Sequence, residues 1–268
     1  MNKITKELEY FNIAQICYSG QCFRMQKLEN GRYRVIAGNR YLEVEQQGKK
    51  VDFFCEETEF EHFWSGYFDL NIDYGKYIEK INPKDSYLMQ AAKLGGGIRI
   101  LRQDLWEMIV SFLISQQNNI VRIRRCIDNI CRRYGQEMPD PAYWAFPTPE
   151  ELAMATEEEL RECNLGYRAK YVLRSARDVA EGKISLEKIS AMDYPAAREE
   201  LLKFYGVGEK VADCICLFAL HQLQAFPVDT HIRQALEQHY KRGFPRRRYK
   251  GMEGVMQQYI FYYELKKS

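Results

Sequence analysis

The sequence predicts an α+β protein in which a small antiparallel β-sheet near the N-terminus precedes a mainly helical body. Three observations support this fold class. Short runs of alternating apolar and polar residues lie between residues 32 and 54, which is the pattern of half-buried strands. From about residue 85 the apolar residues recur at helical spacing, with capping residues before several segments. The 268 residues, 46% of them apolar, suffice for a full hydrophobic core.

The strand-forming segment consists of short runs divided by turn residues. Residues 32–37 and 41–45 alternate on either side of a glycine-containing turn, and residues 51–54 follow a second glycine. These three runs predict an antiparallel meander. A helix is expected directly after it, over residues 59–68.

The helical body begins with two helices that the sequence marks clearly. Asp104 is expected to cap the first, and isoleucines from Ile120 to Ile130 mark the second, after a polar break at residues 116–119. Two capping boxes begin at Thr148 and Thr156. Further helices are predicted at about 168–181, 195–205, 209–222, 230–240 and 252–266.

The change of pattern predicts two sequential domains, an N-terminal α+β domain over residues 1–95 and a helical body over residues 96–268. No run of about 18 apolar residues is present, so we expect no transmembrane helix and no membrane partner. The N-terminus lacks the apolar region of a signal peptide. We therefore expect a cytoplasmic protein.

Eight cysteines, the last of them Cys216, are spread over the sequence without a CxxC pair. Their spacing does not match a zinc or iron–sulfur site, and most of them lie in apolar runs. The pattern predicts reduced cysteines, without disulfides and without a bound metal.

The net charge of +2 is close to neutral, but the charges are unevenly distributed. Residues 122–133 carry five arginines and one aspartate, and residues 241–250 carry six cations and no anion. Local basic patches of this kind can bind a polyanion on one face of a nearly neutral protein. Solvated helix faces are the alternative interpretation.

The most informative segment runs from Leu201 to Leu236. Two helices in it are joined by Gly206-Val207-Gly208, and glycines in this arrangement allow a tight turn and close approach to a ligand. The free amides at the start of the following helix form an anion site that suits a nucleic-acid phosphate. An ordinary connection between packed helices is the alternative. The motif matches neither a Rossmann fingerprint nor a Walker loop, which disfavours a nucleotide cofactor.

Two charged residues accompany this hairpin. Lys210 lies in the first turn of the second helix, where the helix dipole disfavours a cation, so a nucleophile is one interpretation and a solvated lysine the other. Cys214 lies one turn beyond it on the same face. Asp229 predicts the N-cap of the next helix, and its carboxylate could also offset a developing positive charge.

Residues 206–216 together with Pro227-Val228-Asp229 resemble the helix–hairpin–helix (HhH-GPD) DNA glycosylases, and within them the 8-oxoguanine DNA glycosylase/AP lyase family. Four further motifs match that family in the same order, at residues 19–24, 101–104 with 117–123, 165–171 and 257–261. The resemblance covers most of the chain. It implies a helical glycosylase body that contains a helix–hairpin–helix at about 195–222.

The resemblance implies a bifunctional DNA repair enzyme that extrudes 8-oxoguanine from duplex DNA, excises it through a lysine Schiff base and nicks the strand by β-elimination. Lys210 would attack the sugar C1′, and Asp229 would stabilise the developing sugar cation. The implied partner is double-stranded DNA that contains oxidised guanine, and we expect a monomer that needs no cofactor. The endonuclease III-like branch has a C-terminal four-cysteine iron–sulfur cluster. It cannot form here, because the last cysteine is Cys216.

The resemblance also assigns the remaining site residues, although spacing alone would place Gln257 and Phe261 in an ordinary packing stripe of one helix. The base pocket would be lined by Gly20, Cys214, Gln257 and Phe261. The side chains that wedge into the duplex would be Gln117 and Tyr167, and those that read the opposite base would be Arg122 and Arg168. Phosphates would be bound by Gly206, Gly208, Val211 and His231.

The sequence departs from the family pattern at two positions. Gln117 stands where the family usually has asparagine, which predicts a weaker preference for cytosine opposite the lesion. Tyr205 replaces the usual proline before the hairpin, which should change its rigidity more than its chemistry. A glycosylase for another damaged base and a non-catalytic DNA-binding protein are the alternatives. The presence of both Lys210 and Asp229 favours an enzyme, because phosphate binding needs neither.

Overall fold

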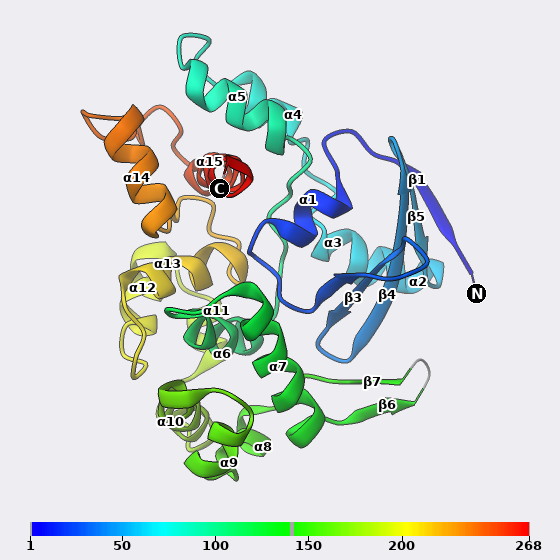
Figure 1. Ribbon diagram of the computed structural model, residues 1–268, viewed down its shortest axis with the longest axis vertical. Helices are drawn as coiled ribbons and strands as arrows, with labels where there is room; N and C mark the ends of the chain where they lie inside the picture. Colours follow the sequence, from blue (N-terminus) through cyan, green and yellow to red (C-terminus); the bar gives the residue numbers. More distant parts are fainter. Residues whose placement is uncertain (1, 140–141, 268) are drawn as a thin grey trace. The chain divides into compact units, whose positions relative to one another are not determined.

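The computed structural model describes residues 2–139 and 142–267, and its elements are labelled in Figure 1. The predicted α+β class is confirmed, since a five-stranded sheet precedes a helical body. The chain forms two compact units, each built from separate stretches. Unit 1 comprises Met1–Val35, Leu42–Arg102 and His221–Ser268, and unit 2 comprises Ile36–Tyr41 and Gln103–Leu220. The division into sequential domains at residues 1–95 and 96–268 stays a prediction.

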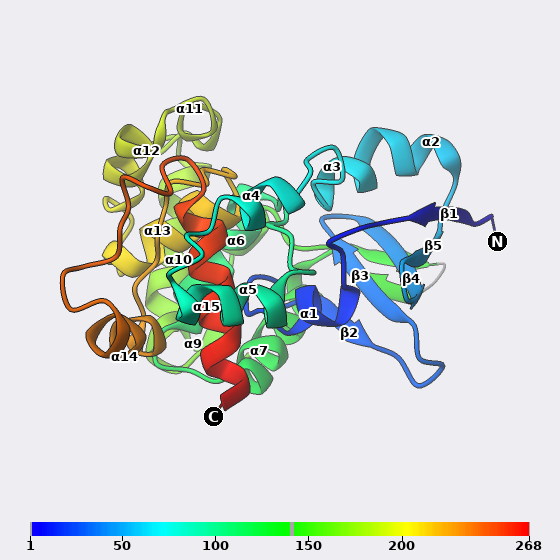
Figure 2. The same cartoon turned by 90° about the horizontal axis from the view of Figure 1, so that it is seen from above.

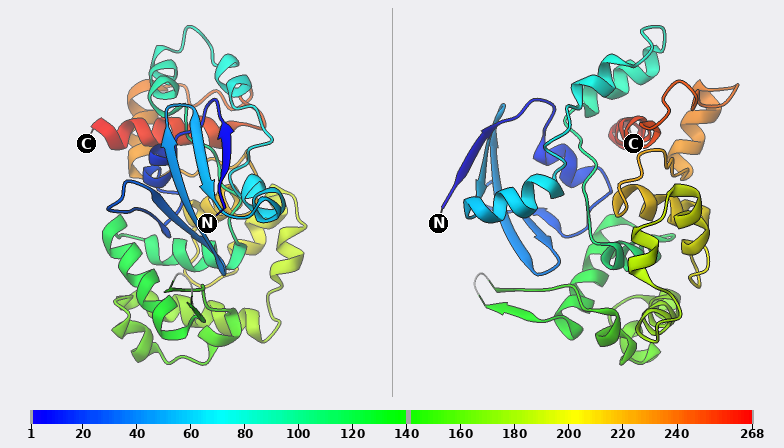
Figure 3. Two further views of the ribbon diagram at one scale, coloured as in Figure 1. Left: turned by 90° about the vertical axis from the view of Figure 1, so that its right-hand side faces the viewer. Right: turned by 180° about the vertical axis from the view of Figure 1, so that it is seen from behind.

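The sheet has the strand order β1-β5-β4-β3-β2 (Figure 3). Its strands are β1 (Ile4–Glu7), β2 (Met25–Lys27), β3 (Tyr33–Ala37), β4 (Arg40–Gln47) and β5 (Lys50–Phe54). The predicted meander is confirmed as β3, β4 and β5, whose inward-facing Val35, Val44 and Phe53 are fully buried. Sequence reasoning missed β1 and β2, because each is short and mostly polar.

Unit 1 also contains helices that precede and follow residues 103–220, the longer of the two stretches that form unit 2. The N-terminal ones are α1 (Ile13–Tyr18), α2 (Glu57–Glu59), a π-helical turn (Phe60–Trp64), α3 (Ser65–Tyr67), α4 (Gly75–Glu79) and α5 (Ser86–Gly95). The continuous stretch from α2 to α3 confirms the helix predicted at 59–68. The C-terminal ones are α14 (Thr230–His239) and α15 (Glu253–Lys267), and α5 crosses α15 and packs against it (Figure 2).

A buried carboxylate, that of Asp69, joins three segments of unit 1. It accepts hydrogen bonds from Arg102 Nε and Nη2 at 3.1 and 2.9 Å and from Tyr74 Oη at 3.0 Å, and His221 Nε2 lies 3.2 Å away. Burial raises the pKa of Asp69, but the neighbouring His221 and Arg102 outweigh it and hold that pKa below its ordinary value. Arg102 and His221 lie at two of the four points where the chain passes from one unit to the other, so Asp69 holds these two ends of the unit 1 stretches together.

Unit 2 is mainly helical, as predicted. Its elements are α6 (Leu105–Ser115), α7 (Ile120–Tyr134), the hairpin β6 (Glu137–Pro139) and β7 (Ala142–Trp144), α8 (Pro149–Ala153), α9 (Glu157–Glu162), a 3₁₀ turn (Gly166–Arg168), α10 (Ala169–Ala180), α11 (Leu186–Ser190), α12 (Tyr194–Leu201) and α13 (Glu209–Phe218). The predicted caps at Asp104, Thr148 and Thr156 all accept backbone hydrogen bonds. Helix α13 ends earlier than predicted, because the chain turns after Phe218 and reaches a left-handed residue, His221 with φ 52°.

All eight cysteines are free thiols and all are buried, which agrees with the apolar runs that contain them. Burial raises the pKa of Cys216 to about 12.

Within residues 2–139 and 142–267, no helix is long and apolar enough to cross a membrane.

Candidate active site

The glycine hairpin of unit 2 lies between α12 and α13 and is shaped by its first glycine. Gly206 has φ 90°, in the region that favours glycine, and a Cβ there would lie 2.6 to 2.9 Å from three ring atoms of Tyr171. Its carbonyl accepts a hydrogen bond from Gln116 Nε2 at 3.0 Å. The hairpin therefore packs against α10 through a position that has no room for a side chain.

The N-terminus of α13 is open. Gly208 is the N-cap residue in an extended conformation, without a side-chain capping bond, and among the described residues no atom outside the adjoining backbone lies within 4 Å of a Cβ built on it. The first helical bond runs from Ala212 N to Gly208 O at 2.9 Å. The amides of Glu209, Lys210 and Val211 therefore have no partner within the helix and can bind an anion. The predicted phosphate contacts of Gly206, Gly208 and Val211 stay predictions.

Lys210, the second residue of α13, is half-buried, and its amine lies over the ring of an aromatic residue. Its Nζ atom is 5.6 Å from the ring centre of Phe112, which in turn stacks on Phe218. Cys214 follows one helical turn later and is 3% exposed. The structure thus places the predicted nucleophile and one predicted pocket residue on the same helix, with an apolar surface beneath the amine.

The predicted wedge and opposite-base residues gather near the start of α7. Gln117 is exposed and has φ 46°, an uncommon conformation for a residue with a long side chain. Arg168 is 3% exposed and donates to Gln116 O at 2.8 Å and to Gln117 O at 2.9 Å. Arg122 is exposed, and its Nη2 lies 3.9 Å from a Cβ position on Gly166. Arg168 therefore holds the Gln117 loop by its carbonyls.

Three tyrosines link this loop region to the glycine hairpin. The rings of Tyr167 and Tyr171 are 5.8 Å apart, and those of Tyr171 and Tyr205 are 5.3 Å apart, both edge to face. Tyr167 and Tyr205 are 41% and 45% exposed. Sequence reasoning gave Tyr171 no role, although its spacing of four residues from Tyr167 on a helix was a signal that the two rings are neighbours.

Unit 1 contains the second predicted catalytic residue. Asp229 caps α14, and its Oδ1 accepts a hydrogen bond from Ile232 N at 2.8 Å, which confirms the predicted cap. His231 is half-buried, and its ring lies edge-on to that of Phe261 at 6.1 Å. Its predicted phosphate contact stays a prediction.

The predicted base-pocket residues of unit 1 lie together around α15. Gln257 is 3% exposed, and its Nε2 donates to Pro227 O at 3.0 Å. Gly20 has φ 75°, and a Cβ there would lie 2.9 Å from Phe261 Cε1. The backbone of Gly20 therefore approaches the Phe261 ring in a way that only glycine allows. Each unit thus assembles its own share of the predicted site residues.

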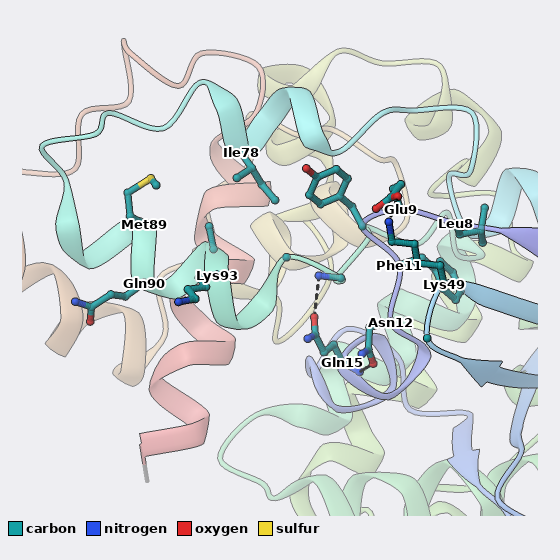
Figure 4. A pocket seen from close by; sticks show the side chains of 15 residues that line it. Leu8, Glu9, Phe11, Asn12, Gln15, Lys49, Ile78, Met89, Gln90 and Lys93 are labelled. Atoms are coloured by element: carbon teal, nitrogen blue, oxygen red, sulfur yellow. Dashed lines mark hydrogen bonds and ion pairs between the residues drawn. The ribbon is translucent and has the colours of Figure 1, made fainter.

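The cavity in Figure 4 is a separate feature of unit 1. It has a volume of about 610 Å³ and is lined by residues of the β1–α1 segment, the β4–β5 turn, α4 and α5, among them Tyr10, Phe11, Gln15, Lys49 and Met89. None of the predicted site residues lines it.

Across the described part of the chain, no group of three or more His, Cys, Asp or Glu side chains is placed to hold a metal ion.

The helix–hairpin–helix, with a lysine at the open start of its second helix and an aspartate-capped helix after it, is the arrangement on which the resemblance to base-excision DNA repair proteins rests. Residues 110–250 match the family model of the HhH-GPD superfamily base excision DNA repair proteins, and residues 3–109 match that of the 8-oxoguanine DNA glycosylase N-terminal domain. The chain belongs to the 8-oxoguanine DNA glycosylase family, which confirms the predicted resemblance.

Three similar proteins support this assignment. The probable N-glycosylase/DNA lyase of Methanothermobacter thermautotrophicus is 33% identical over 72% of this chain and 71% of its own. The N-glycosylase/DNA lyase of Saccharomyces cerevisiae is 43% identical over 54% of this chain, and the match spans only 42% of the yeast protein. The crystal structure of Clostridium acetobutylicum 8-oxoguanine glycosylase/lyase with double-stranded DNA has a TM-score of 0.94 and 38% identity, over 99% of this chain and 96% of that one.

Proposed function

We propose that this protein is a DNA repair glycosylase/lyase that excises 8-oxoguanine from duplex DNA and then nicks the strand. The observation that carries the proposal is Lys210, placed at the open N-terminus of α13 directly after the glycine hairpin. Phosphate binding needs no amine at that position. The proposal is supported by the likeness to the C. acetobutylicum enzyme, whose DNA contains 8-oxoguanine opposite cytosine.

The first step is extrusion of the damaged nucleotide, because a base inside a duplex is inaccessible to a nucleophile. The open amides of α13 and the imidazole of His231 bind the phosphates that flank it. Gln117 and Tyr167 fill the space left in the duplex. Their exposure suits this role, as does the left-handed backbone of Gln117, since strained backbone is often found at functional sites.

Excision then proceeds through Lys210. Its neutral amine attacks C1′, the bond from C1′ to the base breaks, and the base leaves with the bonding electrons and takes up a proton. Loss of the amine proton and opening of the sugar ring leave an imine between Nζ and C1′. Removal of a proton from C2′ then expels the 3′-phosphate by β-elimination. The carboxylate of Asp229 stabilises the positive charge that develops on the sugar.

The lesion is recognised at N7, where 8-oxoguanine has an N–H donor and guanine has an acceptor. The carbonyl of Gly20 accepts from the lesion and repels guanine, and an unmade buried hydrogen bond of this kind amounts to about 1–3 kcal/mol. Gln257 has a second amide hydrogen besides the one donated to Pro227, and this hydrogen reads the Watson–Crick edge. Phe261 and Cys214 cover the two ring faces.

The base opposite the lesion is read by arginine side chains, whose fork matches the adjacent acceptors of an unpaired cytosine. Arg122 is exposed and available for this contact. Arg168 is bonded to the carbonyls of Gln116 and Gln117, so its contact with a base requires the Gln117 loop to release it. Opposite-base reading by Arg168 is therefore coupled to the wedge.

The proposed reaction needs no metal and no redox cofactor, because Lys210 supplies the nucleophile and no step consumes an oxidant or a reductant. An iron–sulfur cluster of the four-cysteine type would need cysteines beyond Cys216, and the sequence has none. We further propose that the enzyme acts as a monomer in the cytoplasm, on nucleoid DNA.

Borohydride trapping tests the proposal directly, because it reduces the imine and fixes the enzyme to DNA. Wild-type protein should be trapped on a duplex that contains 8-oxoguanine opposite cytosine, and not on undamaged duplex. Lys210→Gln should give no trapped complex while it still binds the lesion duplex. Trapping of that variant at the wild-type level would show that another amine is the nucleophile, and trapping only on alkylated duplex would show a different substrate.

A further inference from the structure

The connection between α14 and α15 contains the second basic patch found in the sequence, here named the basic loop (Lys241–Lys250). Its six cations are Lys241, Arg242, Arg246, Arg247, Arg248 and Lys250, and the loop has no acidic residue. All six are exposed. Within the described part of the chain, none of them forms an ion pair.

The other basic patch, at residues 122–133, differs in this respect. Arg132 pairs with Asp128 at 2.8 Å, and Arg133 pairs with Glu159 at 3.1 Å and with Glu162 at 2.6 Å. Two of the five arginines of that patch are therefore neutralised by carboxylates of the protein itself. The basic loop retains its full charge, and an exposed cluster of like charges without counter-charges favours a polyanionic partner.

The backbone of the basic loop is held by an aromatic cluster. The ring of Phe244 lies 4.8 Å from Phe226, 5.2 Å from Tyr240 and 5.4 Å from Tyr249. Tyr249 is fully buried, and its hydroxyl accepts a hydrogen bond from Asn82 N at 3.3 Å. The loop is thus anchored at its middle and at its end, while its charged side chains remain exposed.

A turn places three arginines next to one another on this support. Arg248 N donates to Pro245 O at 2.9 Å, and Tyr249 N donates to Arg246 O at 3.1 Å. The guanidinium of Arg246 lies 4.9 Å from the ring centre of Phe226. Because the turn is already formed in the free protein, these arginines need little ordering to bind a row of phosphates.

We propose that the basic loop is a second phosphate-binding surface, which holds the backbone of duplex DNA several nucleotides away from the lesion. The proposal rests on the proposed function, which places Asp229 and His231 at the damaged nucleotide. These residues begin α14 and the basic loop follows its end, and a helix of 10 residues is about 15 Å long. At about 3.4 Å per nucleotide along one strand, this length corresponds to roughly four nucleotides.

The expected signature is the salt dependence of DNA binding. Each phosphate that a protein neutralises increases the magnitude of the negative slope of log K against log[salt] by about 0.9, which corresponds to about eightfold in affinity at about 0.1 M salt relative to about 1 M. The variant R246Q/R247Q/R248Q should therefore reduce the slope on a long undamaged duplex by about 2 to 3. Its affinity at about 0.1 M salt should fall at least tenfold.

Two matched variants separate the loop from net charge and from shape. K27Q/K50Q/K76Q removes the same charge from three exposed lysines of unit 1 that form no ion pair with a described residue, and it should leave the slope nearly unchanged. R246K/R247K/R248K keeps the charge of the loop and should keep most of the slope. The proposal would be overturned if the two glutamine variants changed the salt-dependence slope equally. It would also be overturned if R246K/R247K/R248K changed the slope as much as R246Q/R247Q/R248Q does.

Truncated duplexes test the position of the contact. The lesion duplex is shortened to fewer than about four nucleotides beyond the lesion, on one side or on the other. The difference in DNA-binding affinity between wild type and R246Q/R247Q/R248Q should disappear for one of the two truncations and persist for the other. Persistence with both, or an unchanged slope on long DNA, would overturn the proposal and leave the loop to a different partner.

The outcome can be separated from that of the proposed function. At low salt, borohydride trapping of R246Q/R247Q/R248Q on the lesion duplex should reach the wild-type level, because the loop does not touch the reacting sugar. If wild-type protein were never trapped, the proposed function would fail. The salt-dependence slopes on undamaged DNA would still show whether the basic loop contacts DNA.

Discussion

Two helices of equal length, one in each unit, begin in different ways. Helix α13 of unit 2 starts at Gly208 without a side-chain cap, and helix α14 of unit 1 starts at Asp229, whose carboxylate accepts a hydrogen bond from Ile232 N. A good N-cap stabilises a helix by about 1 kcal/mol, and glycine provides less. Lys210 in the first turn of α13 adds a further unfavourable contact with the helix dipole.

Each helix start suits a different part of the proposed reaction. The open end of α13 leaves amides free for a phosphate and keeps an amine close to them, at some loss of helix stability. At α14 the cap and the proposed catalytic charge are the same carboxylate, so stability and function coincide. A capping substitution at the start of α13 should therefore raise stability and weaken DNA binding. Removal of the charge at the start of α14 should leave stability unchanged and slow excision.

A second contrast concerns backbone strain. Both Gly20 in unit 1 and Gly206 in unit 2 have positive φ and lie against an aromatic ring, and glycine adopts this conformation without strain. Gln117 in unit 2 has φ 46° with a long, exposed side chain. Gln117 is therefore an unfavourable residue that is kept at a position where the proposed wedge needs a long polar group.

The largest effect is expected at the capped helix. Asp229→Asn keeps an acceptor for Ile232 N, so the free energy of unfolding should change by less than about 0.5 kcal/mol. Loss of the charge that faces the developing sugar cation should lower single-turnover excision by about 10²-fold or more. Thermal unfolding and gel-based excision of 8-oxoguanine measure the two quantities.

Asp104→Asn is the matched control, because Asp104 caps α6 through the same kind of hydrogen bond and accepts from Glu107 N at 2.8 Å. It should leave excision unchanged. If Asp229→Asn lowered melting temperature and excision together, Asp229 would be a structural cap without a catalytic role.

The parts of the fold that the sequence predicts are those that local interactions decide. The caps at Asp104, Thr148 and Asp229 depend on a side chain and an amide a few residues later, so their pattern is legible in the sequence. The short strand Met25–Lys27 was missed because pairing with Tyr33–Ala37, and not its own composition, makes it a strand.

The candidate site shows the same limit. The sequence indicates a turn at Gly206, but not the ring of Tyr171 that excludes a side chain there, since that contact joins distant segments. The family resemblance assigns Arg168 to the opposite base, whereas the structure shows that side chain bonded to the carbonyls of the Gln117 loop. Partners of this kind are set by tertiary packing, which no local pattern encodes.

A smaller effect is expected when the open helix is closed. Gly208 has an extended backbone, and no described residue other than its chain neighbours comes within 4 Å of a Cβ built there, so Gly208→Asp should fit and cap α13. The free energy of unfolding should rise by a few tenths of a kcal/mol, because aspartate is a slightly better N-cap than glycine. Affinity for undamaged duplex should fall about tenfold at about 0.1 M salt, because the new carboxylate replaces and repels one phosphate.

Gly208→Ser is the control for the closed helix, since it adds a cap without a charge. It should gain similar stability and lose less affinity than Gly208→Asp. Unchanged DNA affinity in Gly208→Asp, measured by fluorescence anisotropy, would show that the amides of α13 do not bind phosphate.

The smallest effect is expected at the strained wedge position. Asparagine tolerates the left-handed conformation better than glutamine, so Gln117→Asn should raise the free energy of unfolding by a few tenths of a kcal/mol. It also restores the residue that the family resemblance implies at this position, and the ratio of excision opposite cytosine to excision opposite adenine should increase several-fold. Single-turnover rates with the two duplexes measure this ratio. If the wild-type enzyme already favoured cytosine by several orders of magnitude, Gln117 would not relax the reading of the opposite base, and Arg122 would be the residue to test next.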